Sequence, residues 1–242
     1  MWASFVAFSL APLMGAVFML MLKNPDAMAK EGALSAKAQL MGMVASWDAY
    51  ATILTQAIGV GGILLFGFVA SWLFGREYSE GTAKDLLALP TSRTRILNAK
   101  FCLYLLWCCA LALSNLLLGG LISLLLDLPA PTGSGLHAQL WVYGVTSLLT
   151  LLLGTPLAVF ALWGKSYLAP LGVVALTLVF SQVIASAGWG YYFPWAVPGL
   201  YSGAGGEYKA QLDIWSYLIL LLMSGAGYLA TVTYWKRADQ SK

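Results

Sequence analysis

Apolar residues in this chain gather into six long runs, and the stretches between them hold nearly all of the charges. The runs cover residues 2–22, 49–75, 96–126, 138–164, 166–187 and 214–235. Each has about the 20 residues that an α-helix needs to cross a bilayer, with no charge near its middle. The pattern predicts an all-α integral membrane protein whose residues 1–242 form one transmembrane domain. Pro156 lies inside the fourth run and predicts a kink there.

Composition supports a chain surrounded by membrane lipid. Hydrophobic residues make up 60% of it and charged residues 10%, whereas soluble domains carry about 25% charged residues. The first run has no basic region before it and a long apolar core, so it is predicted to be a retained span and not a cleaved signal peptide. The basic residues form no stripe, which argues against a nucleic-acid partner.

The distribution of lysine and arginine predicts the orientation. If the chain starts inside the cell, nine basic residues fall in the inner loops and tails, and four fall outside. The inner ones are Arg76, Lys84, Arg93, Arg95, Lys100, Lys165, Lys236, Arg237 and Lys242, and the outer ones are Lys23, Lys30, Lys37 and Lys209. Because basic residues favour the cytoplasmic side, both termini are predicted to be cytoplasmic.

An aromatic segment at residues 188–206 separates the fifth and sixth runs on the predicted outer side. It is rich in tryptophan and tyrosine, which favour the membrane–water interface, and it contains Pro194 and Pro198, which argue against one long helix. Two interpretations stay open, a re-entrant element or a loop that lies on the lipid headgroups.

No Asp, Glu, Lys, Arg or His falls in the middle of any run. Ion-coupled carriers usually place ionisable groups there, so this absence weakens such a mechanism, although a sodium site built from carbonyl groups stays open. Neutral polar residues remain, chiefly Gln56, Asn115 and Gln182. They either hydrogen-bond between helices or line a path for an amphipathic substrate.

Catalytic and metal-binding chemistry finds little support. Cys102, Cys108 and Cys109 share one apolar run, and their spacing fits neither a zinc site nor a disulfide framework. His137, the single histidine, lies at an outer boundary. The tripeptide at residues 164–166, Gly-Lys-Ser, resembles the end of a phosphate-binding loop, but Val159 stands where that motif needs glycine.

The loop at residues 76–95, between the second and third runs, is the most charged part of the chain. The chain has 13 basic and 10 acidic residues. Eight of these charged residues lie in residues 74–101, which are the loop and its flanks. Thr82 with Asp85 forms an approximate capping box and predicts a short helix, which Pro90 ends. Leu86 and Leu87 share one face of that helix.

A short amphipathic helix of this kind rests on lipid or docks on a soluble protein. Three acids close to its start, Glu77, Glu80 and Asp85, favour a protein partner over a lipid surface. Thr91 or Ser92 is predicted to cap the next helix, which carries the arginines of the loop into the third run.

Residues 75–100, GREYSEGTAKDLLALPTSRTRILNAK, strongly resemble the cytoplasmic loop of ABC-2 type transporter permeases of the bacitracin- and lantibiotic-export kind. The shared pattern is an acidic residue, Gly-Thr, an apolar helix, Pro-x-Ser-Arg and a lysine that enters the next span. It falls on Glu77, Gly81, Thr82, Leu86, Leu87, Pro90, Ser92, Arg93 and Lys100. The segment YFPWAVPGLYS, residues 192–202, and the six-span layout also resemble this family.

The resemblance implies a coupling helix that sits in a cleft of a cytoplasmic ABC ATPase subunit. The implied ATPase contacts are Glu77, Gly81, Thr82, Asp85, Leu86, Leu87, Pro90 and Arg93. ATP and Mg²⁺ would then bind the separate subunit, so that this chain carries no cofactor and is not itself an enzyme. Two permease copies, identical or different, would pair with two ATPases in the cell membrane of a bacterium.

One departure from the family concerns the start of the chain. Family members usually carry an amphipathic interfacial helix before the first span, whereas here the apolar run begins at Trp2. Either the start is misassigned or that helix is absent.

The sequence therefore predicts the permease subunit of an ATP-driven exporter of an amphipathic substrate, such as a peptide antibiotic or a lipid. Two alternatives remain at this stage. The chain could be a membrane scaffold or assembly subunit with a cytoplasmic partner and no transport, or an ion-coupled secondary transporter.

Overall fold

The computed structural model describes residues 2–23, 44–82, 90–129 and 135–237, and within these ranges the chain is helical and contains no strand. The α-helices are α1 (Trp2–Lys23), α4 (Trp47–Gln56), α5 (Gly62–Ser79), α7 (Arg93–Leu125), α8 (Gly135–Leu152), α9 (Thr155–Trp163), α10 (Leu168–Ser186), α11 (Val197–Tyr201) and α12 (Ile214–Arg237). A π-helix, η1 (Ala57–Gly61), joins α4 to α5, and two 3₁₀ turns, η2 (Gly190–Tyr192) and η3 (Gly206–Gln211), flank α11.

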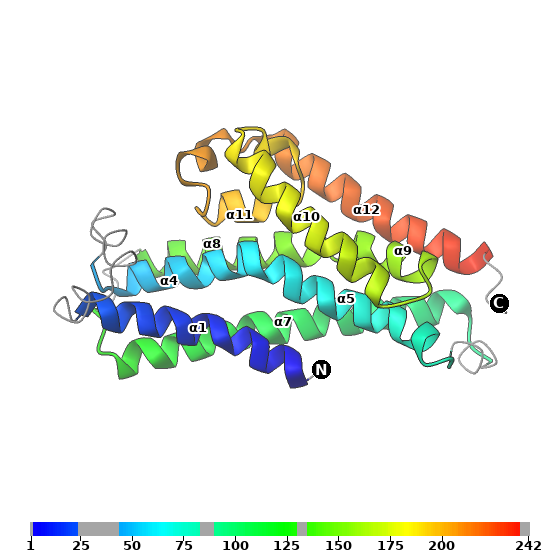
Figure 1. Ribbon diagram of the computed structural model, residues 1–242, viewed down its shortest axis with the longest axis horizontal. Coiled ribbons are helices and arrows are strands. Elements are labelled where there is room, and N and C mark those ends of the chain that lie inside the picture. The colour runs from blue at the N-terminus through cyan, green and yellow to red at the C-terminus, as the bar shows by residue number, and fades with distance from the viewer. Residues whose placement is uncertain (1, 24–43, 83–89, 130–134, 238–242) are drawn as a thin grey trace.

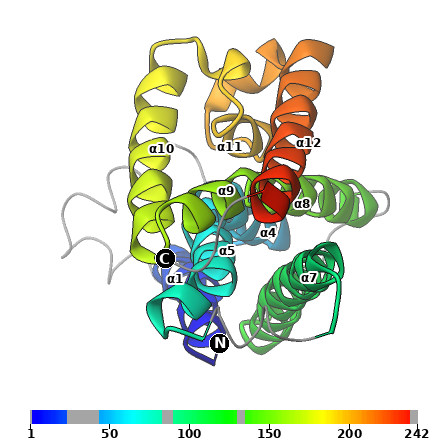
Figure 2. The ribbon, with the colours of Figure 1, turned by 90° about the vertical axis from the view of Figure 1, so that its right-hand side faces the viewer.

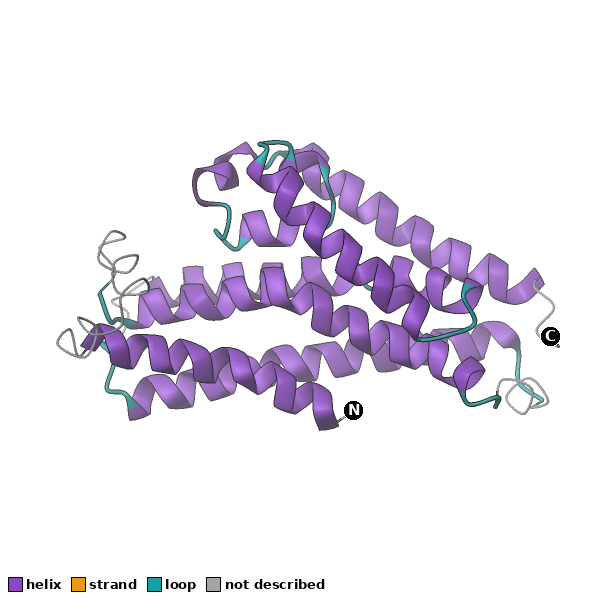
Figure 3. Ribbon diagram, viewed as in Figure 1, coloured by secondary structure: helices purple, strands orange, loops and turns teal. Residues whose placement is uncertain are grey.

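Six helical stretches are long and apolar enough to cross a membrane, which confirms the all-helical prediction for the described residues. They are Ser4–Lys23, Trp47–Ser79, Arg93–Leu125, Gly135–Trp163, Leu168–Ser186 and Ile214–Arg237. We call them spans 1 to 6. Helices and loops alternate along the bundle as Figure 3 shows.

The spans pack in three layers (Figure 1). Helices α1 and α7 form one outer layer, α4, α5, α8 and α9 form the middle, and α10 and α12 form the other outer layer. The view along the bundle in Figure 2 shows the same order. In the most apolar 18-residue stretch of spans 2 and 4, 61% of the residues are buried. The corresponding stretches of spans 1 and 5 are 22% and 17% buried. The middle layer therefore supplies the packed interior.

Large apolar side chains on the outer layers point away from the bundle. Leu117 and Leu124 on α7 are 72% and 80% exposed, and Leu222 on α12 is 71% exposed. A water-facing surface rarely carries so many contiguous apolar groups. These faces suit lipid, where the helical backbone satisfies its own hydrogen bonds.

Span 4 is interrupted between α8 and α9, where the sequence predicted a kink at Pro156. The interruption frees backbone carbonyls, and neighbouring spans satisfy them. The Tyr104 hydroxyl on α7 donates to Leu151 O at 2.8 Å, and the Ser224 hydroxyl on α12 donates to Leu152 O at 3.0 Å. Proline breaks are tolerated within membranes when neighbouring helices supply such partners.

The second half of span 4 is held closely by span 6. A methyl group at Gly227 of α12 would lie 2.6 Å from Pro156 Cα, so the two backbones touch at this point. Thr155 Oγ1 also donates to Ser224 O at 2.9 Å. Small residues allow this kind of close approach between membrane helices.

Candidate functional site

The two charged ends of the loop motif meet inside the bundle. Glu77, in the last turns of α5, forms an ion pair and hydrogen bond with Lys100 of α7. Lys100 is only 8% exposed, and its Nζ also lies 3.4 Å from Leu73 O and within 6 Å of the ring centroids of Phe74 and Trp235. The pair ties together the two helices that enter and leave the loop.

The backbone conformation at Gly81 explains why the loop motif has a glycine at this position. Helix α5 ends at Ser79, and Gly81 follows with φ of +73°, a conformation that suits glycine at the end of a helix. Its N–H donates to Tyr78 O at 3.3 Å. No atom of the described residues lies within 4 Å of a methyl group placed at Gly81, so it is the backbone angle that favours glycine here.

The predicted coupling helix is not covered by the described residues. Asp85, Leu86 and Leu87 fall within residues 83–89, outside them. Thr82, the predicted cap, and Pro90 bound this segment, and both are exposed. The coupling role of these residues stays a prediction.

On the far side of the loop, the predicted cap of the next helix is confirmed. Ser92 is the N-cap of α7, and its hydroxyl accepts from Arg95 N at 3.4 Å. Arg93 follows at the first helical position, with its Nη1 3.5 Å from Trp235 O in the last turn of α12. A cation near helix-terminal carbonyls is favourable, so Arg93 connects the loop to the end of span 6.

An aromatic cluster packs next to these charged residues. Phe74, Phe101 and Trp235 from α5, α7 and α12 belong to one buried group with Leu97 and Leu162. The Phe74 and Phe101 rings are 4.6 Å apart. The cluster reaches both α9 and α12, so the loop motif rests on the same end of four spans. We call this end of the bundle the motif end.

The three neutral polar residues predicted to line a path do not converge. Asn115 is 1% exposed between α7 and α8, where the Tyr143 hydroxyl donates to Ala112 O at 2.6 Å and lies 3.3 Å from Asn115 Oδ1. Gln56 ends α4, with its Nε2 4.0 Å from a methyl group placed at Gly203. Gln182 lies on α10 and lines a cavity that neither Asn115 nor Gln56 lines.

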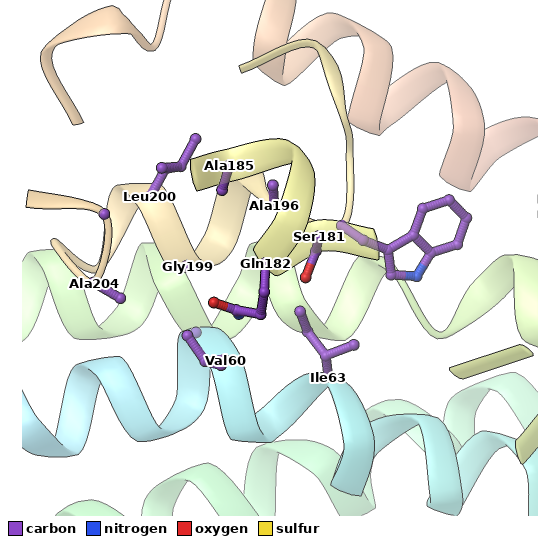
Figure 4. Close-up of a pocket in the computed structure, with 12 residues that line it drawn as sticks. Val60, Ile63, Ser181, Gln182, Ala185, Ala196, Gly199, Leu200 and Ala204 are labelled. Atoms are coloured by element: carbon purple, nitrogen blue, oxygen red, sulfur yellow. The ribbon is translucent and has the colours of Figure 1, made fainter. Parts of the chain in front are cut away.

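This cavity separates α10 from the π-helix of span 2 and from α11 (Figure 4). Gln182 points from α10 toward Val60, with Ser181 beside it, while Gly199 and Leu200 of α11 close another side. Its volume is about 40 Å³, enough for a water molecule or two and too small for a substrate. In this conformation the structure therefore holds a small pocket here and not a channel.

Helix α11 reaches the middle of span 2. A methyl group at Gly59 in η1 would lie 2.7 Å from Pro198 O and 2.9 Å from Ser202 Cβ. Gly59 is the thirteenth residue of the helical stretch Trp47–Ser79, so this contact lies about 18 Å along the axis at 1.5 Å per residue. Sequence reasoning missed this contact, although the glycine-rich segment IGVGG at residues 58–62 is the signal that could have indicated it.

Metal and nucleotide chemistry is not represented among the described residues. They contain no group of three or more His, Cys, Asp or Glu side chains that could hold a metal ion. The three cysteines are free, with Cys108 buried and the other two exposed. Lys165, in the Gly-Lys-Ser tripeptide, lies in a turn between α9 and α10 with φ of +45° and follows a helix, not a strand.

These features define a multi-pass helical protein of the cell membrane, with a charged loop motif packed against the ends of four spans. The chain belongs to the ABC-2 transporter family, whose model matches residues 1–183. It is thus the membrane-spanning permease component of an ABC transporter.

One curated relative is the bacitracin transport permease protein of Bacillus licheniformis. It is 25% identical over 178 residues, which cover 74% of this chain and 85% of that protein. No solved structure matches the chain.

Proposed function

We propose that this chain is the permease of an ATP-driven exporter and that residues 76–95 couple it to a separate ABC ATPase. The observation that carries the coupling proposal is the ion pair between Glu77 and the buried Lys100. It fixes α5 to α7 at the two ends of the loop, so a force applied to the loop is delivered to both helices together.

The motif end offers a route from the loop to the rest of the bundle. Arg93 contacts the last turn of α12, and the cluster around Trp235 joins α5, α7, α9 and α12. Protein interiors are close-packed and transmit displacement between neighbours. A movement of the loop would therefore move the inner halves of spans 2, 3, 4 and 6 as a unit.

An amphipathic substrate, such as a peptide antibiotic or a lipid, fits the neutral interior best. The central polar groups are amides and hydroxyls, without charges that an ion gradient could use. The similarity to a bacitracin transport permease supports a peptide antibiotic as the first substrate to test.

The first experiment addresses coupling. Replacing Leu86 and Leu87 with Asp places two charges on the apolar face of the proposed coupling helix. We expect the variant to insert normally but to lose copurification with its ATPase and ATP-dependent flux in liposomes. The control variant carries Met at both positions and keeps the face apolar.

Retained copurification and normal flux in the aspartate variant would contradict the coupling assignment. The same liposomes separate the other functions. Flux driven by an ion gradient without ATP would indicate a secondary transporter, and binding of the ATPase without flux would indicate a scaffold.

A further inference from the structure

A larger cavity, of about 290 Å³, lies at the end of the bundle opposite the motif end. It is bounded by the second half of α4, by the first half of α8 and by the segment that follows α11. Thr52, Thr55, Gln139, Ser202 and Lys209 contribute its polar groups. We call it the Lys209 cavity, and no function discussed above uses it.

The cavity has one cation. The Lys209 ammonium lies 5.3 Å from the centroid of the Tyr201 ring, a cation–π contact that orients it. Among the described residues, Lys209 forms no ion pair. The nearby carboxylate of Asp48 does not line the cavity and instead accepts a hydrogen bond from Gln139 Nε2. An ammonium beside a cavity, with no ion-pair partner among the described residues, favours an anionic ligand.

The three hydroxyl groups that line the cavity can only accept hydrogen bonds from a ligand. The hydroxyls of Thr52, Thr55 and Ser202 each donate to a backbone carbonyl three or four residues earlier, at 2.6–2.8 Å. A hydroxyl has one proton and two lone pairs, so a ligand meets these groups as acceptors. Three hydroxyl acceptors favour a ligand that carries hydrogen-bond donors.

We propose that the Lys209 cavity binds the headgroup of an anionic amphiphile that bears hydroxyl groups, of which glycerophosphate is the simplest example. The phosphate meets Lys209, the hydroxyls donate to the acceptor groups, and the apolar part lies against Ala51, Ala138 and Val142. A volume of 290 Å³ equals that of about ten water molecules, which fits one headgroup. This binding does not require the chain to be an exporter.

The test uses the full-length protein in detergent after removal of copurified lipid, with ligand affinity measured by thermal shift. The probes are dioctanoyl phosphatidylglycerol, dioctanoyl phosphatidic acid without the glycerol hydroxyls, dioctanoyl phosphatidylcholine without net charge, and soluble glycerol 1-phosphate. We expect phosphatidylglycerol to bind more tightly than the other two lipids. Binding of glycerol 1-phosphate assigns the site to a free phosphate ester, and its failure to bind assigns the site to a lipid headgroup.

Two variants locate the binding. Lys209→Met removes the charge and should weaken phosphatidylglycerol binding about 10-fold or more, as expected for loss of a charged hydrogen bond. Lys209→Arg keeps the positive charge and should retain the binding. Ala138→Phe fills the cavity and leaves every charge in place, so it should weaken binding similarly. Lys236→Met removes an exposed lysine at the motif end and serves as the matched control.

Several results would overturn the proposal. Equal binding by the parent and Lys209→Met would remove the role of the cation. Unchanged binding in Ala138→Phe would show that Lys209 meets headgroups outside the cavity. Equal affinity for phosphatidic acid and phosphatidylglycerol would exclude the hydroxyl contacts. The melting temperature of each ligand-free variant shows that it is folded.

Discussion

At the scale of single residues, Glu77 and Lys100 are the most informative pair in the structure. Their positions are 23 residues apart, and the family resemblance had placed both at the edges of a cytoplasmic loop. The structure pairs a half-buried Glu77 with a buried Lys100, whose ammonium lies within 6 Å of the ring centroids of Phe74 and Trp235. Glu77 thus has an intramolecular partner, while its contact with an ATPase stays a prediction.

The pair gives a stability prediction. Glu77→Met or Lys100→Met alone leaves one buried charge without its partner, which costs about 3–5 kcal/mol in buried pairs. We expect each single variant to lower the melting temperature by about 10 °C, given about 2–4 °C per kcal/mol for chains of this size. The measurement is thermal unfolding of the purified protein in detergent.

The double variant supplies the control. With both residues changed to Met, no charge is left unpaired, and replacing a buried pair with apolar groups is often neutral. We expect its melting temperature to return close to that of the parent. Additive losses in the double variant would show that the side chains act independently.

At the scale of elements, the irregular segments of spans 2 and 4 matter more than their regular parts. The π-helix η1 admits α11 at Gly59, and the break before Pro156 is closed by Tyr104 and Ser224. Both lie well inside the helical stretches Trp47–Ser79 and Gly135–Trp163. π-Helical segments inside helices are frequent at functional sites. The re-entrant interpretation of residues 188–206 stays a prediction, which the contact of α11 with Gly59 supports.

The α11 contact can be tested with two glycines of the same π-helix. Gly59→Ala places a methyl group 2.7 Å from Pro198 O, whereas a methyl group at Gly61 meets no atom of the described residues within 4 Å. We expect Gly59→Ala to destabilise the protein by about 1–3 kcal/mol through overpacking. Gly61→Ala should be neutral or stabilise it by up to about 1 kcal/mol, because alanine favours helix.

Thermal unfolding of both variants checks the element-scale prediction. The comparison controls for helix propensity, since both substitutions are Gly→Ala within five residues of one helix. Equal stability of the two variants would mean that α11 does not rest on η1 in the membrane.

At the scale of the whole molecule, the two ends of the bundle carry different chemistry. The motif end gathers arginines, the buried ion pair and aromatic rings, and the opposite end holds the Lys209 cavity. The excess of basic residues at the motif end predicts that it faces the cytoplasm.

Accessible cysteines test this orientation. In intact cells, a membrane-impermeant maleimide should label Glu207→Cys in η3 and should reach Lys236→Cys only after permeabilisation. Both positions are exposed. The parent chain with its three native cysteines gives the background signal. Labelling of Lys236→Cys in intact cells, with Glu207→Cys protected, would reverse the proposed topology.

The sequence by itself determined the number of spans, the kink in span 4, a cap at Thr91 or Ser92 and the charged loop. These follow from local patterns, since hydropathy, proline and capping residues act within a few turns of their own position. Only the tertiary structure decided that spans 2 and 4 form the middle layer, that Glu77 pairs with Lys100, and that α11 rests on Gly59. All six spans are apolar enough to cross a membrane, so the contacts among them depend on side-chain shapes and polar partners that lie far apart in the chain.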